Sequence, residues 1–194
     1  MDLSQAPIRI ASEKIVDRLR LAFPERDFTI ERVPPNMTLK EFERVVRKVP
    51  FLGLAFVGLS PDGESGRRVQ AKQRWRLILV YKSSGAQAVR FTGDKRGIGL
   101  DAMVDVASVM MHGHAIEGLG DTTLTSAESM IADGWTDEHL VLAKVDFEVR
   151  YIAQPSTFQL KTAEDFKALG VTWLSDLDEP VEDTITLNEE EANG

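Results

Sequence analysis

In two long segments of this chain, residues 70–82 and 140–151, mostly apolar side chains alternate with mostly charged ones, with a period of two residues. Because successive side chains of a β-strand point to opposite faces of a sheet, this period predicts two strands that each bury one face. The chain is therefore expected to build a sheet with a core on one side. The predicted inward rows are Ala71, Gln73, Trp75, Leu77, Leu79 and Tyr81, and Ala143, Val145, Phe147, Val149 and Tyr151.

Three further strands are expected around these two. Residues 51–59 are almost all apolar, which is typical of a strand buried on both faces, and they form a hairpin with residues 70–82 through a turn-rich tip. Residues 28–33 precede two prolines that cannot donate to a ladder, so this strand is expected at a sheet edge. Residues 122–132 form a polar strand, which an Asp133-Gly134 turn joins to the last one.

Three helices complete the expected fold. Residues 12–23 have helical spacing and stop at Pro24, and Thr38 with Glu41 forms a capping box for a second helix. Residues 100–114 are apolar on two stripes, which predicts a helix covered on most sides. The fold class predicted is α+β: a mostly antiparallel sheet with helices packed mainly on one face and an extended C-terminal tail.

The charge of the chain is concentrated at its C-terminal end. Residues 176–194 hold eight acidic side chains and no basic one, while the rest of the chain holds 23 of each sign. We expect one domain over residues 1–152 and an arm over residues 153–194, acidic and partly disordered from 176. The acidic segment is either a solvated tail or an arm that docks on a basic surface of a neighbouring subunit.

A glycine-spaced loop, residues 93–99, opens directly onto the third helix. A phosphate-binding loop needs Lys and Ser or Thr after its last glycine, but Leu100 and Asp101 stand there. A carboxylate in the first helical turn also repels the anion that a helix N-terminus attracts. The spacing does not fit the dinucleotide fingerprint either. We therefore expect a tight loop at a helix start and no nucleotide cofactor.

No constellation of catalytic or metal-ligating residues is evident in the sequence. The chain has no cysteine, which excludes disulfides and thiolate sites, and its three histidines include His112 and His114, whose spacing points them in different directions on one helix. No Gly-x-Ser-x-Gly elbow is present. The expectation is no catalytic residue, no metal, no cofactor and no enzyme. The N-terminal residues lack a signal peptide pattern, and no apolar run could span a bilayer, so we expect a cytoplasmic chain.

The strongest charged feature before the tail is a basic strip formed by Lys72, Arg74 and Arg76, with Arg67 and Arg68 at the hairpin tip. The strip is either a solvated strand face with edge-protecting charges or a surface for an acidic partner. That partner could be nucleic acid phosphate or the acidic arm of another copy. The residues assigned to a subunit or partner interface are Arg67, Arg68, Lys72, Arg74, Arg76, Asp94, Lys95, Arg96, Asp183, Glu189 and Glu190.

Four phrases of the sequence resemble a known family. They are RWRLILV at residues 74–80, GIGL at 97–100, LVLAKVDFEV at 140–149 and DTITL at 183–187. With this order of elements, the chain resembles the tail terminator proteins of Mu-like contractile-tailed phages and prophages.

The resemblance implies a structural virion protein that forms a homohexameric ring on the head-proximal end of the tail. Such a ring stops polymerisation of the tube and sheath and offers a surface to the head connector. The implied partners are other copies of the chain, tail tube and sheath proteins, and the connector, with DNA passing through unread and no membrane. The implied location is the virion tail, with the host cytoplasm during assembly. Two alternatives remain: another head–tail connector or baseplate component, and a nucleic-acid-binding module.

Overall fold

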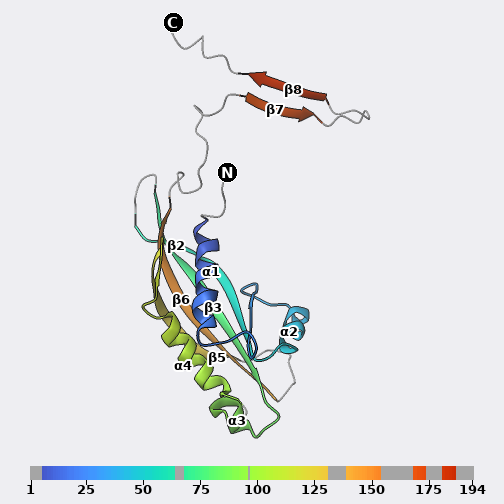
Figure 1. Ribbon diagram of the computed structural model, residues 1–194, viewed down its shortest axis with the longest axis vertical. Helices are drawn as coiled ribbons and strands as arrows, with labels where there is room; N and C mark the ends of the chain where they lie inside the picture. Colours follow the sequence, from blue (N-terminus) through green and yellow to red (C-terminus); the bar gives the residue numbers. More distant parts are fainter. Residues whose placement is uncertain are drawn as a thin grey trace. The chain divides into compact units, whose positions relative to one another are not determined.

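The computed structural model describes residues 6–63, 68–95, 97–130 and 139–153, and the backbone of two strands, β7 (Ala168–Trp173) and β8 (Val181–Thr186). The chain divides into two units, shown in Figure 1. The main unit, Ser4–Gln154, contains a six-stranded sheet and is called the body below. The second unit contains β7 and β8, which pair with each other as an antiparallel two-stranded sheet.

The sheet of the body has the strand order β1-β2-β3-β6-β5-β4, and every pair except β1 with β2 is antiparallel. Together with the helices, this sheet confirms the predicted α+β class. Because β3 and β6 pair along their whole lengths, the two strands with the clearest alternation form the centre. The strands are β1 (Thr29–Arg32), β2 (Phe51–Pro61), β3 (Val69–Lys82), β4 (Ala115–Ile116), β5 (Gly120–Met130) and β6 (Leu140–Ala153).

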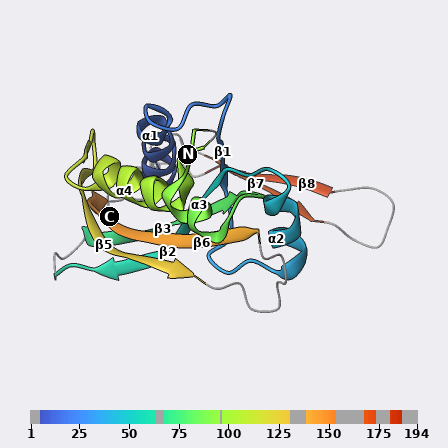
Figure 2. The same cartoon turned by 90° about the horizontal axis from the view of Figure 1, so that it is seen from below.

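Four helices accompany the sheet: α1 (Pro7–Arg20), α2 (Leu39–Val46), α3 (Gln87–Thr92) and α4 (Gly99–Met111). Figure 2 shows α1 and α4 on one side of the sheet. They cover the main core, to which β3 contributes Trp75, Leu77 and Leu79. All five residues of the predicted inward row of β6 are buried, as are all six of β3.

The opposite face of the sheet, called the open face below, is covered only in part. Here Ile78 and Val80 of β3 pack in a second core with Phe42 and Val45 of α2. The capping box predicted for α2 is present: the Thr38 hydroxyl accepts a hydrogen bond from the Glu41 N–H. The helices therefore lie mainly on one face, as predicted, and α2 covers one end of the other.

Several boundaries differ from the sequence-based expectation, most of all in the first helix and in β2. The first helix begins at Pro7, five residues before Ser12, because proline at the first helical position has a suitable φ and needs no hydrogen-bond partner. It ends at Arg20 rather than at residue 23. In β2 only residues 51–55 are buried, and a bulge after Phe56 takes the remainder to the surface. The connection between β2 and β3 is also shorter than expected, since Pro61 still belongs to β2.

The helix after the glycine loop, predicted to be covered on most sides, is covered in the body except at Asp101, Asp105 and Val109. One stripe of α4, which includes Leu100, Met103 and Ala107, is fully buried, but Val109 on the second stripe is 74% exposed. The helix packs on the sheet and also meets α3 and α1, and Arg18 Nε of α1 donates a hydrogen bond to the Met110 carbonyl at 3.3 Å. These neighbours leave Val109 uncovered.

A buried threonine fixes the end of α4 to the sheet. The hydroxyl of Thr122 donates to the Met111 carbonyl and accepts from the His114 N–H at 3.1 Å. Backbone bonds from Gly113 N to Thr122 O and from Thr122 N to His114 O, both 2.9 Å, complete the junction. This side chain, 1% exposed, lies in the strand predicted only as polar.

Candidate interface on the open face of the sheet

The predicted basic strip lies on the open face, beside the region that α2 covers. The pairing of β3 with β6 sets Lys72 opposite Arg150, Arg74 opposite Glu148, and Arg76 opposite Asp146. Side chains that oppose one another on the same face of a sheet have Cβ atoms about 5 Å apart. Charges of both signs therefore meet here, and the basic strip is one row of a surface that carries both cations and carboxylates, called the mixed field below.

Two of the three strip residues have carboxylate partners on β6. Arg76 donates to Asp146 through Nε and Nη2, with N···O distances of 2.7 and 2.9 Å, and Lys72 Nζ lies 3.3 Å from Glu148 Oε2. By accepting these hydrogen bonds, the Asp146 carboxylate raises the pKa of Arg76 above its ordinary value against the effect of burial, so the arginine is charged. These two cations are committed to partners within the chain.

The mixed field continues around the strip. Lys144 Nζ lies 3.1 Å from Glu128 Oε2 on β5, and Arg150 Nε lies 3.3 Å from Asp62 Oδ2 after β2. Ion pairs this exposed stabilise a fold by about 0–1 kcal/mol each, so their main effect is on the potential of the face. A face in which four cations each meet a carboxylate has little net attraction for phosphate.

Arg74 is the exception in the strip. It is exposed and has no ion-pair partner among the residues that the structure describes. A Cβ placed on Gly58 of β2 would come within 3.2 Å of its Nη2, so the missing side chain at this bulge leaves room for the guanidinium. Arg74 lies in a hollow of about 150 Å³ whose lining includes Val57 and Thr125, from strands on either side of β3 and β6.

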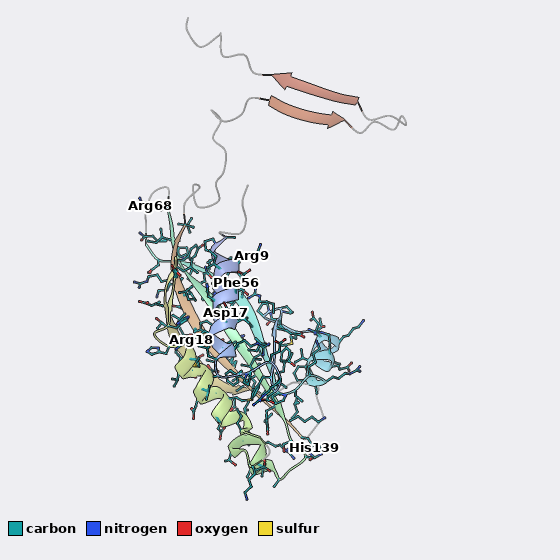
Figure 3. The ribbon with its side chains drawn as sticks, in the orientation of Figure 1. Arg9, Asp17, Arg18, Phe56, Arg68 and His139 are labelled. Carbon is teal, nitrogen blue, oxygen red and sulfur yellow. The ribbon has the colours of Figure 1, made fainter. Side chains whose placement is uncertain are left out.

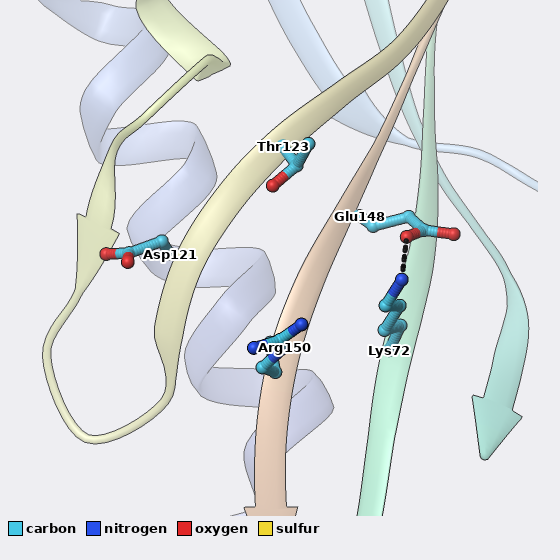
Figure 4. Close-up of a pocket in the computed structure, with 5 residues that line it drawn as sticks. All are labelled: Lys72, Asp121, Thr123, Glu148 and Arg150. Atoms are coloured by element: carbon cyan, nitrogen blue, oxygen red, sulfur yellow. Dashed lines mark ion pairs between the residues drawn. The ribbon is translucent and has the colours of Figure 1, made fainter. Parts of the chain in front are cut away.

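A second, larger hollow of about 330 Å³ shares one wall with the first, at Glu148. Figure 4 shows its lining and the ion pair that crosses it. We call the two hollows together the charged groove. The larger one is lined by Lys72, Asp121, Thr123, Glu148 and Arg150.

The other predicted interface residues are not gathered at this groove. Asp94 and Lys95 follow α3, and Gly97 of the same loop lies against Tyr81 near the end of β3. Tyr81 comes nine positions after Lys72 in β3, which is about 30 Å at the usual rise. Figure 3 likewise places Arg68 and His139 at opposite ends of the body. The single interface predicted from the sequence is therefore at least two separate places.

Several predicted residues fall outside the part of the chain that can be described. Arg67, Arg96, Glu189 and Glu190 lie outside the described residues, as does the turn at residues 133–134. For Asp183 only the backbone is described, and it pairs with Val171 across the β7–β8 sheet. Their assignment to an interface stays a prediction.

The glycine loop is a tight turn at a helix start, as expected. Gly93 and Gly99 both have φ of 76°, and the Asp94 N–H donates to the Gly97 carbonyl at 2.8 Å. A Cβ on Gly93 would lie 2.5 Å from that same carbonyl oxygen, and one on Gly99 would lie 2.3 Å from the Gly93 nitrogen. Close approach of backbone to backbone accounts for these glycines.

The histidines have separate surroundings. The His112 ring accepts a hydrogen bond from the Leu124 N–H at 3.3 Å, and Arg90 Nη2 lies 3.3 Å from the His139 ring. Burial, with a smaller contribution from Arg18, lowers the pKa of His114 below its ordinary 6.5. Among the described residues there is no group of three acidic or histidine side chains placed to hold a metal ion.

The sequence-based reasoning missed the residues that decide the character of this face, namely the carboxylates Asp146 and Glu148. Their place in the outward row of the last strand is visible in the sequence, but their proximity to the strip depends on β3 and β6 being neighbours.

No described helix is long and apolar enough to cross a membrane. A scan against models of known protein families finds no match, and a search of curated proteins finds no similar sequence.

Proposed function

We propose that this protein is a structural subunit that assembles with copies of itself into a closed ring, and that the ring is the terminator of a contractile phage tail. The observation that carries the proposal is the division of the chain into a body and a separate two-stranded sheet. The strands of this small sheet have six residues each. A two-stranded sheet of this size is marginally stable in water by itself, so it needs a surface to pack on.

A ring supplies that surface. When each subunit places its arm on the next one, the interface is heterologous, and a rotation that closes gives a ring with no unsatisfied arm. The body and the arm also differ in charge, since the last 19 residues carry the whole excess of negative charge. Complementary charges at such an interface set its register and its association rate more than its affinity.

The place of the ring in a virion comes from the sequence resemblance. In that family the ring lies at the head-proximal end of the tail, ends the growth of tube and sheath, and presents a surface to the head connector. The charged groove is a suitable docking surface for such a protein partner. Its fixed charges attract a partner whose charges are complementary to them and repel a partner whose charges are not.

A nucleic-acid-binding module is the second candidate function. The basic strip favours it, but Lys72 and Arg76 are paired with Glu148 and Asp146. Phosphate binding at these two cations would have to displace their carboxylates, which leaves Arg74 as the strip residue without an ion-pair partner among the described residues. The alternative of another connector or baseplate component differs only in which ring of the virion the subunit forms.

The mass of the native protein tests the proposal. We expect a species of six times the 21.6 kDa chain, stable or dependent on concentration, by native mass spectrometry and analytical ultracentrifugation. Deleting residues 176–194 should lower the hexamer fraction if the arm is the contact. A monomer at every concentration that binds DNA in a salt-sensitive manner would instead establish the nucleic-acid module.

Charge reversal tests the surface of the body. Arg74→Glu, combined with reversal of Arg67 and Arg68, should leave the monomer folded and abolish assembly or tail completion. Lys40→Glu, at an exposed position of α2, is the matched control. Normal tails from the triple variant would mean that the strip is a solvated face.

A further inference from the structure

The two edges of the six-stranded sheet are protected to very different degrees. At one edge β1 has only four residues and is followed closely by Pro34 and Pro35. Short length and prolines are common ways of preventing a sheet edge from pairing with another chain. At the other edge β4 pairs only with Gly120 and Asp121, the first two residues of β5. The rest of β5 lies beyond its reach.

The next part of β5 is occupied by the end of α4. The N–H and carbonyl of Thr122 bond to His114 and Gly113, and the Leu124 N–H bonds to the His112 ring. For residues 125–130 no strand pairs on this outer side in the part of the chain that the structure describes. This stretch has no proline and only one charge, Glu128, which pairs with Lys144. Thr125 lies in the bulge between Leu124 and Ser126, and residues 126–130 beyond it form a regular, largely uncharged strand edge.

The chain itself contains strands that need such an edge. Both strands of the β7–β8 sheet have an unpaired outer side among the described residues. A third strand is generally required for a small sheet to be stable. β7 has six residues, and the open stretch of β5 is of similar length, with five residues, 126–130, in regular register.

Charge decides which of the two strands fits. β7 has the sequence ALGVTW, without a charged residue, whereas β8 carries Glu182 and Asp183. Opposed charges of like sign on neighbouring strands are destabilising, so β8 would be repelled by Glu128. A neutral strand rich in strand-forming residues meets no such penalty.

We propose that β7 of one copy adds to the outer edge of β5, at residues 125–130, in a neighbouring copy, so that each arm extends the sheet of the next subunit. Main-chain hydrogen bonds then supply the affinity, as in other cases of strand addition. The inference rests on the proposed function in one respect, that copies of the chain assemble. It adds the contact through which they do so.

Disulfide trapping tests the contact, and the chain is well suited to it because it has no cysteine. One set of variants carries a single cysteine in β5, at Ala127 or Ser129, and another carries one in β7, at Gly170, Val171 or Thr172. Side chains of paired strands are close enough for a disulfide. Mixing a β5 variant with a β7 variant under mild oxidation should give a linked dimer on a non-reducing gel, for the combinations in register. Because the two cysteines are on different chains, only contact between copies can produce it.

Controls separate this contact from random oxidation and from contact within one chain. Lys40→Cys, on α2, mixed with the β7 variants should give no linked dimer above the level of each variant alone. A double variant with cysteines at Ser129 and Thr172 that links only within its own chain would overturn the exchange between copies. If the native protein is hexameric and none of the six combinations links above the control, the strand contact is wrong while the ring stands. If the native protein is a monomer throughout, the proposed function itself fails.

Discussion

Replacing Thr122 by valine should destabilise the body measurably, although valine has nearly the same shape. The hydroxyl is buried and bonds to the Met111 carbonyl and the His114 N–H at the junction of α4 and β5. Valine fills the space but leaves these two polar groups without that partner. Leaving a buried donor or acceptor unsatisfied costs about 1–3 kcal/mol, so we expect a loss of about 2 kcal/mol in the free energy of unfolding.

Thermal unfolding followed by circular dichroism measures this loss. For a chain of this length each kcal/mol corresponds to about 2–4 °C, so the Tm should fall by about 4–8 °C. The control is Thr123→Val, one residue along the same strand, where the side chain is exposed and the change should stay within about 0.5 kcal/mol. An equal effect of the two substitutions would refute the view that the hydroxyl holds the helix end to the sheet.

Three other predictions concern single groups. The pKa of His114 is near its ordinary 6.5 in the unfolded chain and lower in the folded chain, so the free energy of unfolding should decline as the pH falls below 6.5. Urea unfolding at several pH values should show a smaller decline for His114→Gln. Gly97→Ala should lower the Tm because its Cβ would lie 2.2 Å from Tyr81 Oη, and Tyr81→Phe should restore most of the loss, since the next atom, Cζ, is at 3.3 Å; no rescue would mean that another contact is responsible. ATP or GTP with Mg²⁺ should leave the Tm unchanged, whereas a ligand at 100 times its Kd would add about 2.7 kcal/mol and a clear upward shift.

Periodicity predicted the faces of the strands well, because the pattern of side chains along one strand is a local property. Every residue of the two inward rows is buried, including the polar Gln73, whose Oε1 accepts a hydrogen bond from Trp75 Nε1 at 3.0 Å. The capping box of α2 was equally local and equally correct. By contrast, the helix predicted from Ser12 starts at Pro7, and the packing of Ala11 in the core shows that the additional turn belongs to the folded structure.

The neighbours of each strand were beyond the reach of the same reasoning. Arg76 and Asp146 are 70 residues apart in the chain, and no pattern within either strand states that they meet. For this reason the sequence alone predicts a basic strip from a row of cations, although β6 supplies carboxylates to two of them. Ile78 and Val80 continued the same row, and their apolar character was an available sign that another element, here α2, covers that end.

The strand order also sets a sequence of events during synthesis. The central pair of the sheet joins residues 69–82 to residues 140–153, so the ribosome must produce nearly the whole body before its middle can close. Pairing over such long separations is slow and leaves strand edges exposed for some time. The arm follows immediately after β6 along the chain. The arm of each polypeptide is therefore synthesised while its own sheet is still closing, so newly made arms and open strand edges are present at the same time.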